Sequence, residues 1–159
     1  MTGRSNVHKV GPTLTGVDLE TMTRSRLQVL SQRATPARLR LVAAIAAAGR
    51  PVTITEVLER EPSFAQSSTY RNLQVLEHAG VLHRMVTNDD SARYELAEDL
   101  TEHHHHLICE ACGSVRDVAL GARLERLIDD GLESIASQHG FATTRHVIDV
   151  YGRCASCHS

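Results

Sequence analysis

The segment HHHHLICEACG, residues 103–113, places four consecutive histidines just before a Cys-x-x-Cys pair. Histidine nitrogens and cysteine thiolates are common zinc ligands in proteins. An expression tag is a competing explanation, but a tag normally lies at a chain terminus, whereas this run leads directly into an apolar pair and the cysteines. The segment therefore predicts metal binding within the folded part of the chain.

A second Cys-x-x-Cys pair lies near the end of the chain and has the same spacing as the first. The four cysteines are Cys109, Cys112, Cys154 and Cys157. Each pair has the spacing found in closed, tetrahedral four-cysteine zinc sites. The competing prediction, a thioredoxin-like redox pair, requires one Cys-x-x-Cys at the start of a helix in a βαβ unit. Two pairs favour a structural zinc ion.

Strand geometry divides the four histidines into two pairs. Because successive side chains of a strand point to opposite faces, His103 and His105 share one face, and His104 and His106 share the other. A solvated polar strand is the alternative, and it explains one or two histidines better than four. Further ligands for each face must come from elsewhere in the chain. The candidates are His83, Glu95, Asp117, Glu125, Asp129 and His146.

The order of the predicted elements indicates an α+β protein with two parts. Residues 23–33, 35–49, 53–60 and 67–80 have helical patterns, and residues 81–96 read as a hairpin around Asn88-Asp89-Asp90. Helices followed by a two-stranded wing are typical of a winged helix-turn-helix. Strands over 103–108, 114–118 and 143–151 and a helix over about 122–139 form a small α+β unit. We expect a mobile segment (1–20), a winged-helix domain (21–96), a hinge (97–102) and a metal-binding domain (103–159).

The charge is distributed unevenly along the chain. Residues 1–88 carry 11 Lys/Arg and 6 Asp/Glu, whereas residues 89–159 carry 6 Lys/Arg and 13 Asp/Glu. A basic first half indicates a unit that binds a polyanion. The opening residues have no apolar run typical of a signal peptide, and no segment approaches the roughly 18 apolar residues of a membrane span. We therefore expect a cytoplasmic protein that does not bind membranes.

The pattern SSTYRNL predicts the helix that reads DNA. In a helix-turn-helix, the N-terminal residues of the second helix lie at the base edges of the major groove. Small hydroxyl residues let the backbone approach phosphates, while Tyr70 and Arg71 offer a long hydrogen-bonding side chain and a cation. Any capped amphipathic helix shares this pattern, so three further features are needed to support the prediction: the wing, the basic first half, and Arg38 and Arg40 on the preceding helix. The candidate DNA-binding residues are Ser67, Ser68, Thr69, Tyr70, Arg71 and Arg38.

Together these motifs resemble the ferric uptake regulator (Fur) family, whose members include iron, zinc, nickel and peroxide sensors. The resemblance runs from about Arg24 to Cys157. It rests on TPARLRL, STYRNLQVLEHAGVLHR, YEL, HHHHLICEACGSVRDV, QHGF and YGRCASC. It implies a transcription regulator, not an enzyme, that forms a homodimer through the α+β unit. Such a dimer binds inverted-repeat DNA operators when metal is bound.

The resemblance also implies three metal sites. The four cysteines match the structural zinc site of the family. The regulatory site between the domains matches His83, Glu95, His104, His106 and Asp117. The site in the dimerisation domain matches His103, His105, Asp129 and His146. Glu125 is the alternative to Asp129, because the segment before QHGF is about one turn longer than usual.

Two positions favour zinc as the sensed metal. Many iron and peroxide sensors place a histidine where this chain has Pro51, and His83 stands where zinc sensors place a ligand. Nitrogen-rich ligation suits Zn²⁺, but Fe²⁺, Ni²⁺ or Mn²⁺ fit the same ligands, so iron-, nickel- and peroxide-sensing members are alternatives.

Two other classes of metal-binding protein are more remote alternatives to a regulator. A zinc hydrolase would need an open coordination position and a nearby general base. A metal buffer would use the histidine run alone.

Overall fold

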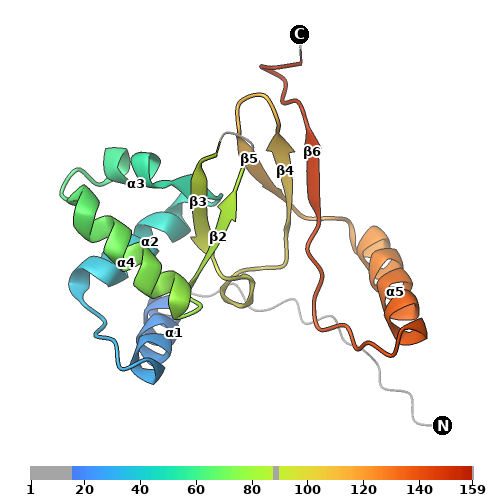
Figure 1. Ribbon diagram of the computed structural model, residues 1–159, viewed down its shortest axis with the longest axis horizontal. Coiled ribbons are helices and arrows are strands. Elements are labelled where there is room, and N and C mark those ends of the chain that lie inside the picture. The colour runs from blue at the N-terminus through green and yellow to red at the C-terminus, as the bar shows by residue number, and fades with distance from the viewer. Residues whose placement is uncertain (1–15, 88–89, 159) are drawn as a thin grey trace. The chain divides into compact units, whose positions relative to one another are not determined.

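The computed structural model describes residues 16–87 and 90–158, which form two compact units (Figure 1). The first unit runs to Met85 and resumes over Ala92–His103, and the second comprises Val86–Ser91 and His104–Ser159. Within the described residues, no helix is long and apolar enough to cross a membrane.

The helices of the first unit are α1 (Gly16–Val29), α2 (Pro36–Ala48), α3 (Ile54–Arg60) and α4 (Gln66–His78). The predicted ends of α2 are confirmed. The side chain of Thr35 accepts a hydrogen bond from the backbone N–H of Arg38, and Pro36 occupies the first helical position. Gly49 ends the helix with a φ of 61°, a left-handed conformation that glycine adopts without strain.

Helix α1 begins earlier than predicted. Residues 16–20 were expected in the mobile segment, but they form the first turn of the helix; residues 1–15 lie outside the described residues. Leu19, Thr23 and Leu27 recur at four-residue spacing, and all three are buried. Their packing extends the helix toward the N-terminus, where the local sequence has little periodicity.

Helix α4 also begins differently from the prediction, which placed the cap at Ser67 or Ser68. The capping residue is Ala65, and no side chain caps this helix. The hydroxyls of Ser68 and Thr69 instead each donate a hydrogen bond to the carbonyl oxygen of Ala65, at 2.9 Å. These residues therefore lie inside the first turn.

A three-stranded sheet completes the first unit. Its strands are β1 (Val52–Thr53), β2 (Leu82–Val86) and β3 (Ala92–Leu96), in the order β1-β3-β2. The predicted hairpin is therefore present, although Asn88 and Asp89 lie outside the described residues. The predicted hinge is partly ordered: the short 3₁₀ helix Glu98–Leu100 follows β3, and Leu100 belongs to the hydrophobic core of the first unit.

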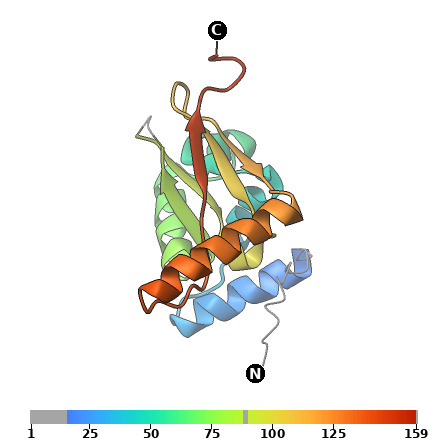
Figure 2. The same ribbon diagram turned by 90° about the vertical axis from the view of Figure 1, so that its right-hand side faces the viewer.

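The second unit contains β4 (His105–Cys109), β5 (Val115–Val118), α5 (Ala122–Gln138) and β6 (Asp149–Gly152). Strand β4 is central, antiparallel to β5 and parallel to β6. The chain leaves β5, passes through α5 and returns to form β6 (Figures 1 and 2). Strand β6 begins later than the predicted strand over 143–151, because residues 143–148 have no regular secondary structure, and it ends one residue later, at Gly152.

Candidate metal centres and nucleic-acid interface

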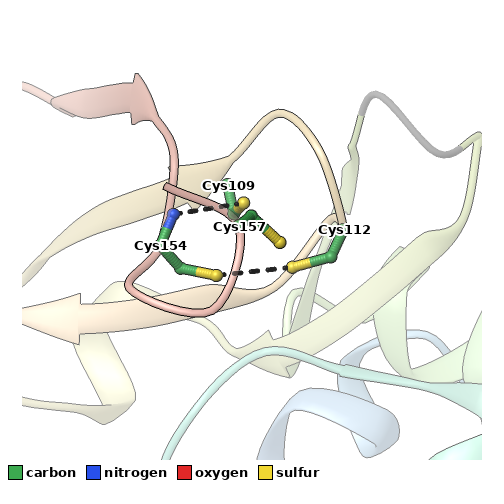
Figure 3. A group of neighbouring side chains, drawn as sticks. All are labelled: Cys109, Cys112, Cys154 and Cys157. Carbon is green, nitrogen blue, oxygen red and sulfur yellow. Dashed lines mark hydrogen bonds between the residues drawn. The ribbon is translucent and has the colours of Figure 1, made fainter. Parts of the chain in front are cut away.

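The four cysteines converge from two loops of the second unit (Figure 3). Cys109 is the last residue of β4 and Cys112 lies in the turn that follows, whereas Cys154 and Cys157 follow β6, which pairs with β4. All four Sγ atoms lie within 4.8 Å of one another, and those of Cys112 and Cys154 are 3.7 Å apart. A zinc tetrahedron with Zn–S bonds of about 2.3 Å separates its sulfurs by about 3.8 Å, so the four thiols have the spacing of a zinc site.

Hydrogen bonds shift the pKa values of these thiols in opposite directions. The backbone N–H of Cys154 donates to Sγ of Cys109 at 3.3 Å and lowers the pKa of Cys109. The side chain of Ser156 and the neighbouring thiols lower the pKa of Cys154 to about 6. The hydrogen bond with Cys154 raises the pKa of Cys157 to about 12. Four thiolates cannot share this volume without a cation, so the donor set fits a divalent metal ion that binds all four.

A second group of possible ligands surrounds the buried carboxylate of Glu125 on α5. Its oxygens lie 3.2 Å from Nε2 of His105 and 3.0 Å from Nε2 of His146. The two imidazole rings stack with their centroids 5.3 Å apart. A carboxylate is costly to bury without a cationic partner, and a divalent cation shared with two imidazoles would remove that cost.

Asp129, the predicted acid of this group, contacts His146 from the other side of the ring. Its Oδ1 lies 3.1 Å from Nδ1 of His146, whereas Glu125 lies at Nε2. Glu125, the alternative left open by the sequence, therefore has the better position for a shared ion. His103 belongs to the first unit, where its Nδ1 lies 2.6 Å from Oε1 of Glu98. Its role as a ligand stays a prediction.

A third group lies on the β4–β5 pair of the second unit. His106 and Asp117 are register partners, and Nε2 of His104 lies 3.9 Å from Oδ2 of Asp117. The rings of His104 and His106 meet edge to face with centroids 5.2 Å apart. One ligand atom from each of the three residues lies within 4.8 Å of the others. Two imidazoles and a carboxylate form a donor set that suits Zn²⁺ and several other divalent metals.

The two predicted ligands of the first unit contact each other on the wing strands. Nδ1 of His83 on β2 lies 3.1 Å from Oε1 of Glu95 on β3. Glu95 is buried, while the side chain of His83 is about half exposed. The sequence pattern had assigned both residues to one site, but it did not predict that they contact each other directly.

The predicted DNA-binding residues divide between the exposed and buried sides of α4. Ser67, Tyr70 and Arg71 are exposed, and their spacing places them on one face. Thr69 is only 3% exposed and its hydroxyl donates to the carbonyl oxygen of Ala65, so its position does not favour the predicted contact with DNA. Gln74 is also exposed and extends the same face by one turn, a periodic signal that the sequence prediction missed.

Arg38 lies on α2 and is not part of the exposed face of α4. It is half-buried, its Nε donates to Oδ1 of Asn72 on α4, and its Nη1 donates to the carbonyl oxygen of Arg33 at 2.7 Å. The bond to Asn72 joins α2 to α4, and the bond to Arg33 joins α2 to the segment that precedes it. Arg38 also lines, with Arg71 and Gln74, a hollow beside α4, so its charge remains close to the candidate DNA surface.

Comparison with known proteins places this architecture in a family. The model of the ferric uptake regulator family matches residues 29–151. The chain belongs to the ferric uptake regulator family. The Fur-family match and the two described units confirm the predicted α+β fold class and the four-cysteine cluster in the C-terminal region.

Relatives of this Fur-family chain include a ferric uptake regulation protein and a peroxide operon regulator. The ferric uptake regulation protein of Campylobacter jejuni is 30% identical over 106 residues, 65% of this chain and 63% of the relative. The peroxide operon regulator of Bacillus subtilis is 28% identical over 96 residues, 60% of this chain and 61% of the relative. The chain thus spans less than two thirds of the length of these relatives.

A solved structure shares the fold over nearly the whole chain. The Helicobacter pylori ferric uptake regulator, described as having three functional metal-binding sites, has a TM-score of 0.72 and 20% sequence identity. The match covers 92% of this chain and 96% of the H. pylori chain. At this identity, the similarity establishes the fold alone.

Proposed function

We propose that this Fur-family chain is a metal-dependent, DNA-binding transcription regulator, a repressor rather than an enzyme, that acts in the cytoplasm. The observation that carries the proposal is that one chain has both three clusters of possible metal ligands and an exposed polar face on α4. The H. pylori regulator, which has three functional metal-binding sites, shares this fold, and by analogy we propose three sites here. We assign structural zinc to the four cysteines and propose Zn²⁺ as the sensed metal, with Fe²⁺, Ni²⁺ or Mn²⁺ as alternatives.

The proposed regulatory site joins His104, His106 and Asp117 of the second unit with His83 and Glu95 of the first. A divalent ion would supply the positive charge that makes this set of ligands favourable in one arrangement of the units. With metal bound, the chain would then populate the arrangement in which these five ligands lie together more than an arrangement in which they lie apart. A preference of about 3 kcal/mol corresponds to a roughly 100-fold coupling between metal affinity and operator affinity.

The proposed site of the dimerisation domain contains His105, Glu125 and His146, with His103 as a further ligand. Glu125 replaces Asp129 as the carboxylate ligand in this proposal, because Glu125 contacts Nε2 of both His105 and His146. Since these residues join β4, α5 and the segment before β6, we expect this site to stabilise the domain and only tune the DNA response.

A selection experiment tests the proposed function directly. The purified chain is incubated with random-sequence duplex DNA, once at buffered free Zn²⁺ and once with a chelator that spares the tightly bound structural zinc. We expect an inverted-repeat sequence to be enriched only with free metal. A metal buffer would enrich no sequence, and a zinc hydrolase would turn over ester or peptide substrates. Enrichment that ignores the metal would contradict metal-dependent regulation.

Substitutions on α4 test the DNA surface. Arg71→Ala should weaken operator binding by about 1–3 kcal/mol and leave the metal content unchanged. Tyr70→Phe should reduce discrimination if the hydroxyl contacts a base edge, and should weaken all sequences equally if it contacts a phosphate. Thr69→Ser is the matched control, because this buried side chain keeps its hydroxyl and is not expected to touch DNA. Unchanged affinity in both Arg71→Ala and Tyr70→Phe would place the DNA surface elsewhere.

The apolar side of α5 supports a homodimer. Leu124 is 49% exposed, Leu127 60% and Ile135 58%, and Glu125 is the one buried residue of this helix. An amphipathic helix with its apolar residues in water needs a partner. We propose a second copy of the chain, because a two-fold dimer would let the same patch cover itself.

Acidic substitutions on α5 test the proposed dimer. Leu127→Glu and Ile135→Glu should shift the protein toward the 17.4 kDa monomer in sedimentation equilibrium, because burying a carboxylate in the interface is costly. Glu133→Gln changes the charge of the same helix without altering its apolar side and should remain dimeric. A wild-type protein that sediments as a monomer at all concentrations would refute the dimer.

A further inference from the structure

Two aspartates flank His106 on the sheet of the second unit. In the β4–β5 pairing His106 lies opposite Asp117, and in the β4–β6 pairing it lies opposite Asp149. The backbone N–H of His106 also donates to the carbonyl oxygen of Ile148 at 3.1 Å. Residues opposite each other in a pleated sheet place their side chains on the same face. Both carboxylates are therefore within reach of one imidazole.

Asp149 contacts the Nδ1 side of His106. Its Oδ1 lies 2.9 Å from Nδ1, a hydrogen-bonding distance, and the His106 side chain is only 5% exposed. A neutral imidazole that donates from Nδ1 carries its lone pair on Nε2. Within the part of the chain that the structure describes, Asp149 belongs to none of the groups whose ligand atoms converge, whereas Asp117 converges with His104 and His106.

We propose that Asp149 positions His106 for metal binding and does not itself bind the metal. The inference rests on the proposed regulatory site of His104, His106 and Asp117. The hydrogen bond from Nδ1 holds the tautomer and the ring plane, and the carboxylate makes Nε2 a stronger donor. The two flanking aspartates thus have different roles: Asp117 is a ligand and Asp149 a positioning residue.

A carboxylate at Nδ1 occurs independently in the second histidine group. Nδ1 of His146 lies 3.1 Å from Oδ1 of Asp129, while Nε2 of His146 lies 3.0 Å from Glu125. One carboxylate contacts the nitrogen that faces the shared ligands, and another contacts the opposite nitrogen. Carboxylate–histidine pairs of this kind orient metal ligands in proteins generally. The repetition on a different histidine supports a positioning role for Asp149.

Cobalt binding to the full-length chain, with zinc retained in the four-cysteine site, tests the proposal. Asp149→Asn should weaken Co²⁺ binding about 10-fold and Asp149→Ala up to about 100-fold, with the same d–d absorption at saturation. Asp117→Asn should change that spectrum, because a ligand is lost. Asp149→Glu should restore part of the affinity. Asp130→Asn removes an exposed carboxylate of α5 and should bind Co²⁺ like the wild type.

Imidazole nitrogen NMR gives a second readout that needs no metal in the regulatory site. At alkaline pH, His106 should carry its proton on Nδ1 in the wild type and lose that preference in Asp149→Ala. If Asp149→Ala fails to fold, Asp149→Asn decides. Wild-type tautomer and Co²⁺ affinity in the Asp149 variants would overturn the proposal, as would a spectrum changed in the way that Asp117→Asn changes it. A wild-type chain that binds no ion beyond the cysteine site would overturn the regulatory site itself.

Discussion

Cys157→Ser is expected to remove one zinc ion per chain and to destabilise the second unit by more than about 4 kcal/mol. The four thiols lie where the segment after β6 meets the end of β4 and the turn that follows it. Because a structural ion contributes its binding free energy directly to folding, loss of one ligand removes much of that contribution. Zinc per chain and the free energy of unfolding in urea measure the two effects.

Ala155→Ser is the matched control for this prediction. It introduces the same residue into the same Cys-x-x-Cys loop at an exposed position and removes no ligand. The control should keep its zinc and its unfolding midpoint. The structural assignment of the cysteines would be wrong if Cys157→Ser retained both its zinc and its stability.

Removal of either His104 or His106 is expected to abolish the roughly 100-fold stimulation of operator binding by metal. His104→Ala and His106→Ala should stay dimeric and keep the zinc of the cysteine site, because neither residue contributes to that cluster. His83→Ala should behave in the same way if the wing supplies a ligand. Operator affinity measured against buffered free Zn²⁺ would detect the loss.

Two other histidines separate this prediction from a general effect of losing an imidazole. His139 is exposed and belongs to no ligand cluster among the described residues, so His139→Ala should respond to metal like the wild type. His105→Ala should mainly lower dimer or thermal stability. If His105→Ala lost the response and His104→Ala kept it, the roles of the two faces would be reversed. Equal losses would indicate one coupled site.

The local features of the chain were predictable because they depend on neighbouring residues. The Thr35 cap, Pro36 and the left-handed Gly49 all act within α2, so the sequence was enough to locate that helix. The Cys-x-x-Cys spacing is equally local, and two copies of it are enough to indicate a four-cysteine site. Strand alternation likewise separated His105 from His106.

The long-range features were decided by tertiary packing. Packing buried Thr69 and moved the start of α4 to Gln66, although the hydroxyl pattern of SSTYR had favoured a cap at Ser67 or Ser68. Helix α1 extends to Gly16 because its residues at four-residue spacing reach the core, which a window of sequence with little periodicity does not reveal.

The carboxylates beside the histidines show the same limit. Sequence spacing left Asp129 and Glu125 as alternatives and did not single out Asp149. Pairing of β4 with β6, strands separated by a helix, sets Asp149 2.9 Å from Nδ1 of His106, and the position of α5 sets Glu125 against His105 and His146. Alternation along one strand follows from backbone geometry alone, but contacts between distant segments depend on register and packing, which arise only when the whole unit folds.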